Sequence, residues 1–390
     1  MKYWRGYLTA AIFGIFTFAL QEFADTHATL VDMIYPYISR LLQTSLAQWS
    51  SGVDFCLWQM AAVLLILAVV VSIILMVVLR WNPIQWLGWV LAGASVLFFL
   101  HTAIYGLNNY AGSIADDIRM EQVEYTVSEL ADATIYYRDK ANELSEKVKR
   151  DESGNVDFPE FAELAEMAAE GFDTLVYDQS YSIFAGSKLP VKELGWADMY
   201  SSMGITGITM GLTGEAAVNP QIPPVSLPFT ICHEMAHRMC IATEKDANFA
   251  AFLACAFHSG TEFQYSAYYM AYRYCYAALA GVGTSAATQM AQDVASGVSD
   301  TLWQDLDTYN DFFSTNKNNT ATNAANKVND AYIKASGDDE GIDSYNNVSS
   351  LLVSWYNQEV VVPSQVVEEM EFDPFDKTQV DVSDIIGSEG

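Results

Sequence analysis

The sequence has few basic residues. Its 390 residues include 19 lysines and arginines against 48 aspartates and glutamates, which gives a formal net charge of −29 at pH 7. Basic and acidic side chains balance within residues 1–114, so the excess negative charge belongs to the remainder of the chain. A segment this acidic repels nucleic acids and anionic lipid headgroups. The composition therefore argues against nucleic-acid binding and predicts an acidic, water-exposed domain.

Cysteine is also scarce, and its spacing is not that of a disulfide framework. The five cysteines are Cys56, Cys232, Cys240, Cys255 and Cys275. Their odd number leaves at least one thiol unpaired, and no two of them form a Cys-x-x-Cys pair. We therefore treat them as small apolar residues.

Charge is absent from three long runs within the first 115 residues. Each run supplies about 20 apolar residues, roughly the length that crosses a bilayer core of about 30 Å. The pattern predicts transmembrane helices at about residues 6–22, 57–79 and 84–105. The last two are separated by only a few residues and are typical of a transmembrane hairpin. The first follows Lys2 and Arg5 as a signal peptide does, but no convincing cleavage site comes after it, which favours a retained anchor.

Basic residues beside these runs predict the orientation, because lysine and arginine next to short loops stay in the cytoplasm. Lys2 and Arg5 precede the first run, and Arg80 lies between the second and the third. Arg40, in the first outer loop, is a mild counter-signal, but acidic residues share that loop. We expect a multi-pass protein of the cytoplasmic membrane with a cytoplasmic N-terminus. Residues 1–110 would be its membrane part, residues 111–361 an extracytoplasmic domain and residues 362–390 an acidic, mobile tail.

The outer part has mainly helical periodicity. Segments rich in glycine, threonine and valine at residues 205–210 and 215–219 are typical of short strands. The expected fold class is mostly α with a small β edge, placed after N-terminal transmembrane helices. Helices are expected at about residues 116–150, 159–176, 227–281, 286–314 and 344–358.

One short motif carries chemistry: His-Glu-Met-Ala-His at residues 233–237. Histidines four residues apart project from the same face of a helix and can hold one metal ion. Glu234 lies between them and can reach a metal-bound water without ligating the metal. The metal lowers the pKa of that water, and Glu234 takes its proton as the water attacks a polarised carbonyl group. The motif predicts a zinc-dependent hydrolase.

Features around the motif favour an active site over a chance match. Apolar Ile231 and Met235 are typical of a buried helix. The extended segments that precede the motif are typical of an edge strand, which binds substrate backbone by strand addition. A candidate third ligand, Glu244, follows within Glu-Lys-Asp-Ala-Asn-Phe at residues 244–249, and Asp246 is the alternative. Asp246 would lie on another side of a helix, so the two cannot serve together.

This arrangement resembles the glutamate zincins, in which a glutamate is the third zinc ligand. The resemblance implies a zincin-like metallopeptidase domain that binds Zn²⁺ through His233, His237 and Glu244. It also implies that Glu234 is the general base and that Asn248 is a polar residue supporting the site.

The chain is more closely similar to a bacterial family of membrane-bound zincin-like proteins catalogued as a domain of unknown function. Members have three N-terminal membrane helices and share Leu-Pro-Phe-Thr before the histidine motif. They tend to have glycine where this chain has Cys240, which would be strained there if the backbone needs a positive φ. The matching segments are residues 227–230, 233–237, 244–249, 265–268, 331–337, 341–345 and 351–352.

Three further residues are weaker candidates. Tyr265 and Tyr268 could donate a hydrogen bond to a tetrahedral oxyanion, although packing is the commoner role in a segment with six tyrosines. His258 could replace Glu244 as a ligand, but an ordinary surface or core histidine is the commoner case.

The predicted function is a membrane-anchored zinc metallopeptidase that hydrolyses peptide bonds on the extracytoplasmic side. Its expected partners are a peptide or protein substrate and the lipid bilayer. The alternative is a non-catalytic zinc-binding membrane sensor or assembly factor. An open coordination position on the metal favours the enzyme, because structural zinc sites fill all four positions with protein ligands.

Overall fold

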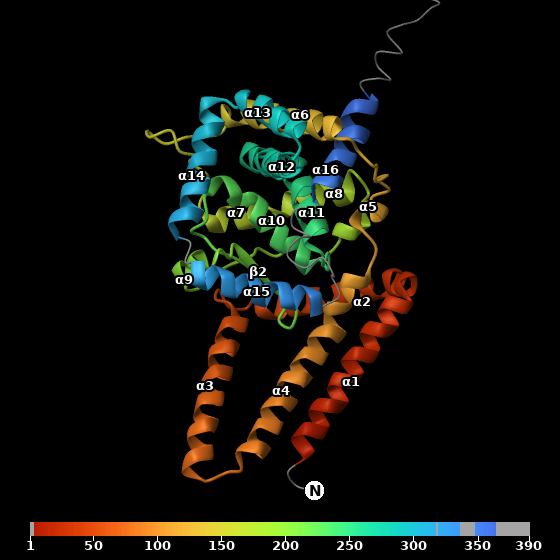
Figure 1. Ribbon diagram of the computed structural model, residues 1–390, viewed down its shortest axis with the longest axis vertical. Helices are drawn as coiled ribbons and strands as arrows, with labels where there is room; N and C mark the ends of the chain where they lie inside the picture. Colours follow the sequence, from red (N-terminus) through yellow and green to blue (C-terminus); the bar gives the residue numbers. More distant parts are fainter. Residues whose placement is uncertain (1–3, 317–318, 336–347, 364–390) are drawn as a thin grey trace, which may run out of the picture.

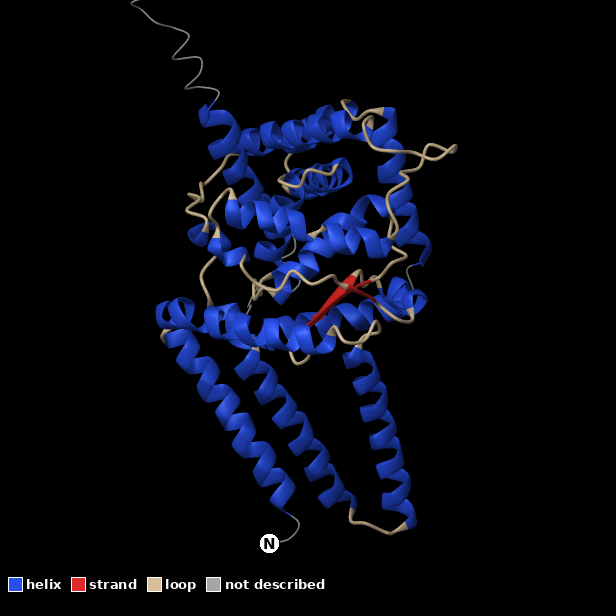
Figure 2. Ribbon diagram, turned by 180° about the vertical axis from the view of Figure 1, so that it is seen from behind, coloured by secondary structure: helices blue, strands red, loops and turns tan. Residues whose placement is uncertain are grey.

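The computed structural model describes residues 4–316, 319–335 and 348–363. The predicted acidic tail begins at residue 362, and its residues after 363 lie outside the described ranges. Residues 341–345, one of the segments that carry the family resemblance, also lie outside them. The described chain is mostly helical with one small sheet, as predicted (Figures 1 and 2). Its α-helices are α1 (Arg5–Thr26), α2 (Ala28–Ser50), α3 (Leu57–Val78), α4 (Pro83–Ile104), α5 (Ile114–Asp117), α6 (Val127–Ser145), α7 (Phe161–Met167), α8 (Ala169–Tyr177), α9 (Ala197–Met203), α10 (Leu227–Arg238), α11 (Glu244–Ala256), α12 (Thr261–Gly281), α13 (Ser285–Ser296), α14 (Asp300–Asn316), α15 (Asn319–Ala335) and α16 (Val348–Tyr356). Short 3-10 turns are η2 (Gly106–Tyr110), η3 (Ser182–Phe184) and η4 (Pro224–Ser226), and a π-helical turn is η6 (Asn357–Val361).

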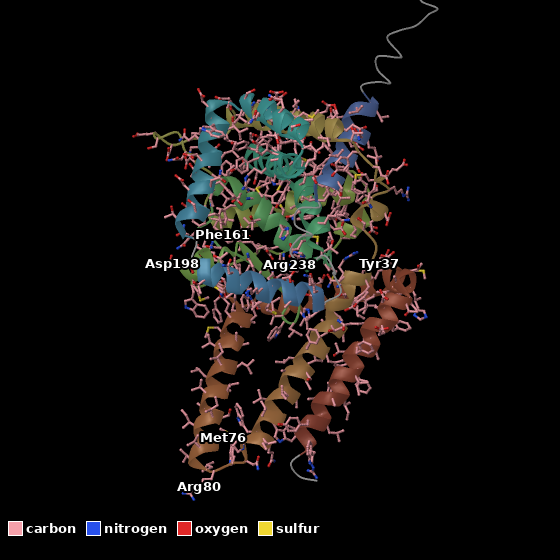
Figure 3. The ribbon with its side chains drawn as sticks, viewed as in Figure 1. Tyr37, Met76, Arg80, Phe161, Asp198 and Arg238 are labelled. Carbon is pink, nitrogen blue, oxygen red and sulfur yellow. The ribbon has the colours of Figure 1, made fainter. Side chains whose placement is uncertain are left out.

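Within the described residues, three helices are long and apolar enough to cross a membrane: α1, α3 and α4. Each has 22 residues, which at 1.5 Å per residue gives about 33 Å. They extend together from one side of the domain, and Arg80 lies at the far tip of the α3–α4 hairpin (Figure 3). Helices α1 and α4 pack closely because Gly6 and Gly88 let their backbones touch. The three predicted spans are therefore present as helices.

The segment between the first two candidate spans, expected to be an outer loop, contains the 23-residue helix α2, which the sequence did not predict. In both views α2 crosses the ends of the membrane-type helices, between them and the domain (Figures 1 and 2). The helix was hard to recognise because it contains Pro36 and because its buried face includes the polar residues Ser39 and Gln43. Only His27 separates α2 from α1.

Other helix predictions differ in their bounds. The helix predicted at residues 116–150 is split into α5 and α6, because Thr126 and Glu129 form a capping box that starts α6 at Val127. The helix predicted at residues 159–176 is two helices, α7 and α8, and α15 was not predicted.

The sheet has three strands: β1 (Lys192–Glu193), β2 (Gly207–Met210) and β3 (Glu215–Val218), in the order β1-β3-β2. Strand β2 is antiparallel to β3, with Thr209 opposite Ala216. Among the described strands β2 therefore has one free edge, as the predicted β edge requires. It lies between the levels of α10 and α15 (Figure 1).

The domain core surrounds α10 and α11. Every residue of α10 is buried, and so are ten of the thirteen residues of α11. Helices α6, α12 and α16 cover them from the side away from the membrane-type helices (Figure 1). The histidine motif is thus held in the most enclosed part of the fold.

Candidate metal centre

His233 and His237 lie one turn apart on α10, and their imidazole rings face each other. Their Nε2 atoms are 3.1 Å apart, and the ring planes are nearly perpendicular, at 86°. Nδ1 of His237 lies 2.9 Å from the carbonyl oxygen of Ile241. Because a carbonyl oxygen can only accept, Nδ1 donates its hydrogen to Ile241, and Nε2 is the ring atom left to bind a metal ion, which would displace any proton on it.

Glu244, the first residue of α11, completes a triangle of donor atoms. Its Oε2 lies 3.3 Å from Nε2 of His233 and 3.5 Å from Nε2 of His237. A tetrahedral zinc ion with bonds of about 2.0–2.1 Å separates its ligand atoms by about 3.3–3.4 Å. Oε2 is also buried with no hydrogen-bond donor among the described residues, as expected of an atom whose partner is a metal. The three residues form a cluster that could hold a metal ion.

The electrostatics of the cluster are those of a strongly coupled acid and base. Burial alone lowers the pKa of His237, but the Glu244 carboxylate outweighs it and raises this pKa to about 9. Burial alone raises the pKa of Glu244, but the facing positive charge of His237 holds it well below its usual range. Glu244 is therefore an anion, the form in which a carboxylate binds a metal.

Glu234 lies beside this triangle without belonging to it, and strand β2 positions its side chain. The Thr209 hydroxyl is 2.7 Å from Oε2 of Glu234 and 2.9 Å from its main-chain oxygen. Gly207 passes directly over the carboxyl group, since a Cβ atom there would lie 2.3 Å from Oε1. Burial raises the pKa of Glu234, so the carboxyl group is a better proton acceptor than a solvated one.

The segment between the ligands turns sharply at Cys240. Its φ is 72°, in the left-handed region where glycine is favoured. The backbone here therefore has the positive φ at which a cysteine is expected to be strained. The turn is closed by the amides of Cys240 and Ile241, which donate to the carbonyl oxygens of His237 and Ala236.

Two residues from the membrane side hold the same turn. The phenol of Tyr105, the residue that follows α4, donates to the carbonyl oxygen of His237 at 3.1 Å. Nε of Arg40, on α2, donates to the carbonyl oxygen of Met239 at 3.2 Å. The position of the second histidine thus depends on the membrane-side helices.

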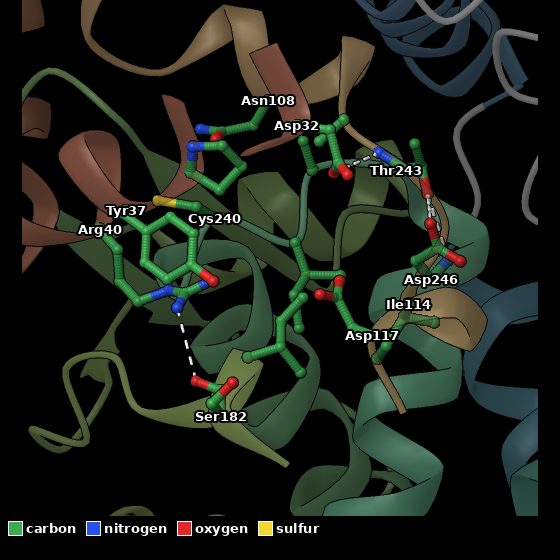
Figure 4. A pocket seen from close by; sticks show the side chains of 16 residues that line it. Asp32, Tyr37, Arg40, Asn108, Ile114, Asp117, Ser182, Cys240, Thr243 and Asp246 are labelled. Carbon is green, nitrogen blue, oxygen red and sulfur yellow. Dashed lines mark hydrogen bonds between the residues drawn. The ribbon is translucent and has the colours of Figure 1, made fainter. Parts of the chain in front are cut away.

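Asp246, the alternative third ligand, has other partners. Its carboxylate accepts hydrogen bonds from the hydroxyls of Ser113 and Thr243, at 3.0 and 2.9 Å. It lines a pocket together with Asp32, Arg40 and Cys240, and none of the three clustered residues lines this pocket (Figure 4). The structure therefore brings Glu244, and not Asp246, to the histidines.

Tyr265, Tyr268 and His258 are not brought to the cluster. The fully buried Tyr265 donates its phenol hydrogen to Asp305 on α14. The ring of Tyr268 packs against Tyr136, Tyr137 and Phe252. His258 stacks on Phe263, and its Nε2 lies 3.0 Å from the carbonyl oxygen of Met167. The geometry gives none of the three the role considered for it, because each already has partners in the core.

Two residues near the cluster were missed from the sequence. Tyr274 donates to Oδ1 of Asn248 at 3.2 Å, and its pKa is raised mainly by burial, next by Tyr309 and least by the charge of Glu244, which lies nearby. Six tyrosines in one helix offer no signal that selects this one. Thr209 was missed because only the fold places β2 against α10, and a glycine and threonine pattern predicts a strand but not its partner.

Comparisons with known proteins give one match. A family model described as "Protein of unknown function (DUF3810)" matches residues 31–353, which include most of α2, all of α3 and α4, the whole sheet and the three clustered residues. No curated protein and no solved structure matches the chain.

Proposed function

The chain belongs to the DUF3810 family, and because the function of that family is unknown, we propose an activity from the site itself: a membrane-anchored, zinc-dependent metallopeptidase. The observation that carries the proposal is the triangle of His233, His237 and Glu244 with Glu234 held beside it. The spacing of the three donor atoms fits zinc, and two histidines with one carboxylate are ligand types that zinc prefers. Three protein ligands leave one coordination position open, as in catalytic sites.

When bound, the zinc ion would act as a Lewis acid that makes water a stronger nucleophile and polarises the substrate carbonyl group. The chain's own residues supply the remaining functions. Glu234 takes a proton from the attacking water, and its buried carboxyl group has a raised pKa suited to that transfer. Thr209 holds the carboxyl group in place.

Strand β2 provides the binding surface for an extended peptide. Its free edge can pair with a substrate backbone by strand addition. Because Thr209 lies in this strand and contacts Glu234, a paired substrate would lie beside the general base. The proposed substrate is therefore an extended segment of a peptide or protein.

The orientation is also a proposal. Arg80 lies at the end of the α3–α4 hairpin farthest from the domain, on the side where the chain begins. Basic residues next to membrane spans stay in the cytoplasm. The domain would then lie on the extracytoplasmic side, and labelling of Arg80→Cys and of Thr288→Cys in intact cells by a membrane-impermeant maleimide tests this. Labelling of the hairpin and not of the domain would reverse the orientation.

The test of the activity compares the parent with Glu234→Gln, both as full chains in detergent micelles. We expect about one zinc per chain in both proteins and a loss of peptide-library cleavage of about 100-fold or more in the variant. Glutamine keeps the shape of the side chain but cannot accept the proton. A variant that cleaves as fast as the parent would exclude Glu234 as the base.

A non-catalytic zinc-binding sensor or assembly factor is the second candidate. The observation in its favour is the direct connection between α3 and the sheet: the carboxylate of Glu215 accepts the amides of Leu57 and Trp58, at 2.8 and 2.9 Å. A movement of α3 would thus reach β3 and, through it, β2. This reading predicts zinc in both proteins and no library cleavage by either.

A further inference from the structure

Helix α2 has its polar and apolar sides reversed relative to a helix on the surface of a soluble protein. Its only charged residues are Asp32 and Arg40. Asp32 accepts the amide of Gly112 at 2.8 Å, and Arg40 donates to the carbonyl oxygen of Met239, so both side chains are engaged by the domain. Gln43, on the same side, donates to the carbonyl oxygen of Gly211 in the turn between β2 and β3.

The opposite face of α2 is apolar and exposed. We call these residues the apolar row, and their side chains are between 40% and 69% exposed: Leu30, Met33, Ile34, Ile38 and Leu41. They recur at helical spacing over three turns, and no charged residue interrupts them. A contiguous apolar face of this length is rare on a surface that meets water and marks a contact with a partner or a membrane.

The connections of α2 identify the partner. Only His27 separates α2 from the candidate span α1, and only residues 51–56 separate it from the candidate span α3. Both ends of α2 are therefore tied to helices that enter the bilayer. The helix lies across the ends of these helices, between them and the domain (Figures 1 and 2). Gln43 and Arg40 bind the domain from one face of α2, so the opposite face, which carries the apolar row, is turned away from the domain.

An exposed aromatic residue lies at the same level. Trp196 is 55% exposed. It follows Gly195, whose amide donates to Oε1 of Gln59 in the first turn of α3. Tryptophan is enriched at the boundary between a bilayer and water. A second side chain suited to the headgroup region thus lies beside the first turn of α3.

We propose that the apolar row binds the bilayer leaflet nearest the domain, with α2 lying in the membrane plane, and that the metal centre therefore acts on polypeptide segments at the membrane surface. Helices of this kind rest at the boundary of headgroups and acyl chains with their apolar face inward. Because the row is uncharged, its binding does not depend on anionic lipids.

The second part of the proposal rests on the proposed peptidase. Tyr105, directly after α4, reaches the backbone of the metal-binding residue His237, and Arg40 of α2 reaches Met239 in the adjoining turn. The turn between β2 and β3 lies on α2 through Gln43. The cluster and the end of the edge strand are thus each one side chain away from elements at the membrane level.

The position of α2 is tested with spin labels on the full chain in phosphatidylcholine vesicles at a low protein-to-lipid ratio. Ile34→Cys and Leu41→Cys are labelled one at a time, and Thr288→Cys on α13, at the far side of the domain, is the control. The five native cysteines are buried, and a labelled parent measures their background. Accessibility to oxygen, which concentrates in acyl chains, is compared with accessibility to a water-soluble nickel chelate.

We expect the labels at positions 34 and 41 to have a ratio of oxygen to nickel accessibility several times that at position 288. Adding phosphatidylglycerol should leave the ratio unchanged. Nickel access at positions 34 and 41 equal to that at 288 would place the row in water and overturn the proposal. Shielding from both reagents would also overturn it, because the row would then be covered by protein, either a second copy or another partner.

The substrate class is tested on the same vesicles with a peptide library attached to an acyl chain through a glycine-serine linker. A linker of about 4 residues keeps the library at the surface, whereas one of about 50 residues lets it extend about 40 Å away. We expect cleavage to be several-fold faster with the short linker. Equal rates would overturn the surface assignment and leave the peptidase standing. No cleavage of either library, nor of the free one, would refute the peptidase and with it this assignment, while the spin-label result stays independent.

Discussion

The hydroxyl of Thr209 lies 2.7 Å from the carboxylate of Glu234 and joins the edge strand β2 to the helix that carries the histidines. A threonine hydroxyl donates only one hydrogen, which this one shares between the carboxylate and the main-chain oxygen of Glu234 at 2.9 Å. The two contacts fix both the position of the strand on α10 and the direction of the carboxyl group. Substrate binding along β2 and proton transfer by Glu234 would therefore depend on the same residue.

Thr209→Val should lower kcat about tenfold and leave zinc content unchanged. Valine has the shape of threonine but cannot hydrogen-bond, so Glu234 loses the group that orients it, and losing such a supporting contact typically costs about 10–100-fold. Steady-state cleavage of a library-derived peptide measures the effect. Thr209→Ser keeps the hydroxyl and should retain most of the rate. A Thr209→Val enzyme as fast as the parent, or a serine variant as slow as the valine one, would contradict the orienting role.

Glu244→Ala and Asp246→Ala should separate metal binding from folding. Glu244→Ala removes one corner of the donor triangle, so zinc should fall well below one per chain after dialysis. Asp246→Ala should keep zinc and reduce the free energy of unfolding by about 1–3 kcal/mol, because the half-buried hydroxyls of Ser113 and Thr243 lose their acceptor. Metal analysis and thermal unfolding in micelles give the two readouts. Loss of zinc in the Asp246 variant alone would reverse the assignment.

The sequence predicts those parts of the fold that repeat a local pattern. Uncharged runs of about 20 residues predict α1, α3 and α4 because bilayer thickness fixes the length of a span. Spacing of four residues predicts that His233 and His237 share a face, because helix geometry is local. Helix α2 was not predicted because its pattern is not a local one. Its charged residues face the domain, so its sequence of polar and apolar residues can be interpreted only once the partner of each face is known.

The site shows the same limit. The ligand Glu244 is close in sequence to the histidines, and a short turn can bring it to them. Thr209 and Tyr105 are far from the motif in sequence, and they reach α10 only through the packing of β2 and the end of α4. The choice of Tyr265 and Tyr268 failed because helix periodicity alone does not say which face of α12 meets the metal-binding residues. Their phenols lie against Asp305 and Tyr136 instead.

Glu215 and Lys192 should show a large coupling in stability. The Glu215 carboxylate is fully buried, accepts the first two amides of α3 and lies 2.7 Å from the ammonium group of Lys192. Glu215→Gln leaves Lys192, whose side chain is only 12% exposed, without its counter-charge and should reduce the free energy of unfolding by about 3 kcal/mol or more. Lys192→Met should cost less, because the two amides still compensate the carboxylate.

The double variant provides the control for this pair. Removing both charges should cost less than the sum of the single changes, since neither group is then left buried and unpaired. Thermal midpoints in detergent micelles rank the three proteins. Additive losses would contradict an energetically coupled pair.

Substitutions at Cys240 should report the cost of the left-handed turn that leads from the second histidine to Glu244. With φ at 72°, a side chain at this position is strained by about 1–2 kcal/mol, and β-branched residues are the least tolerated. We expect the order of stability Gly, then Ala, then Val. The Gly and Ala variants both lack the thiol that lies 3.3 Å from Ser39, so the difference between them measures the backbone alone. Part of the strain relieved by glycine is offset by the greater freedom of glycine in the unfolded chain, which limits the expected gain in stability over alanine to about 1 kcal/mol.

If alanine were as stable as glycine and valine no worse than either, the turn would have to relax out of the left-handed region. In that case the turn would no longer hold Glu244 in position. Zinc content, measured on the same three variants, would then fall as well.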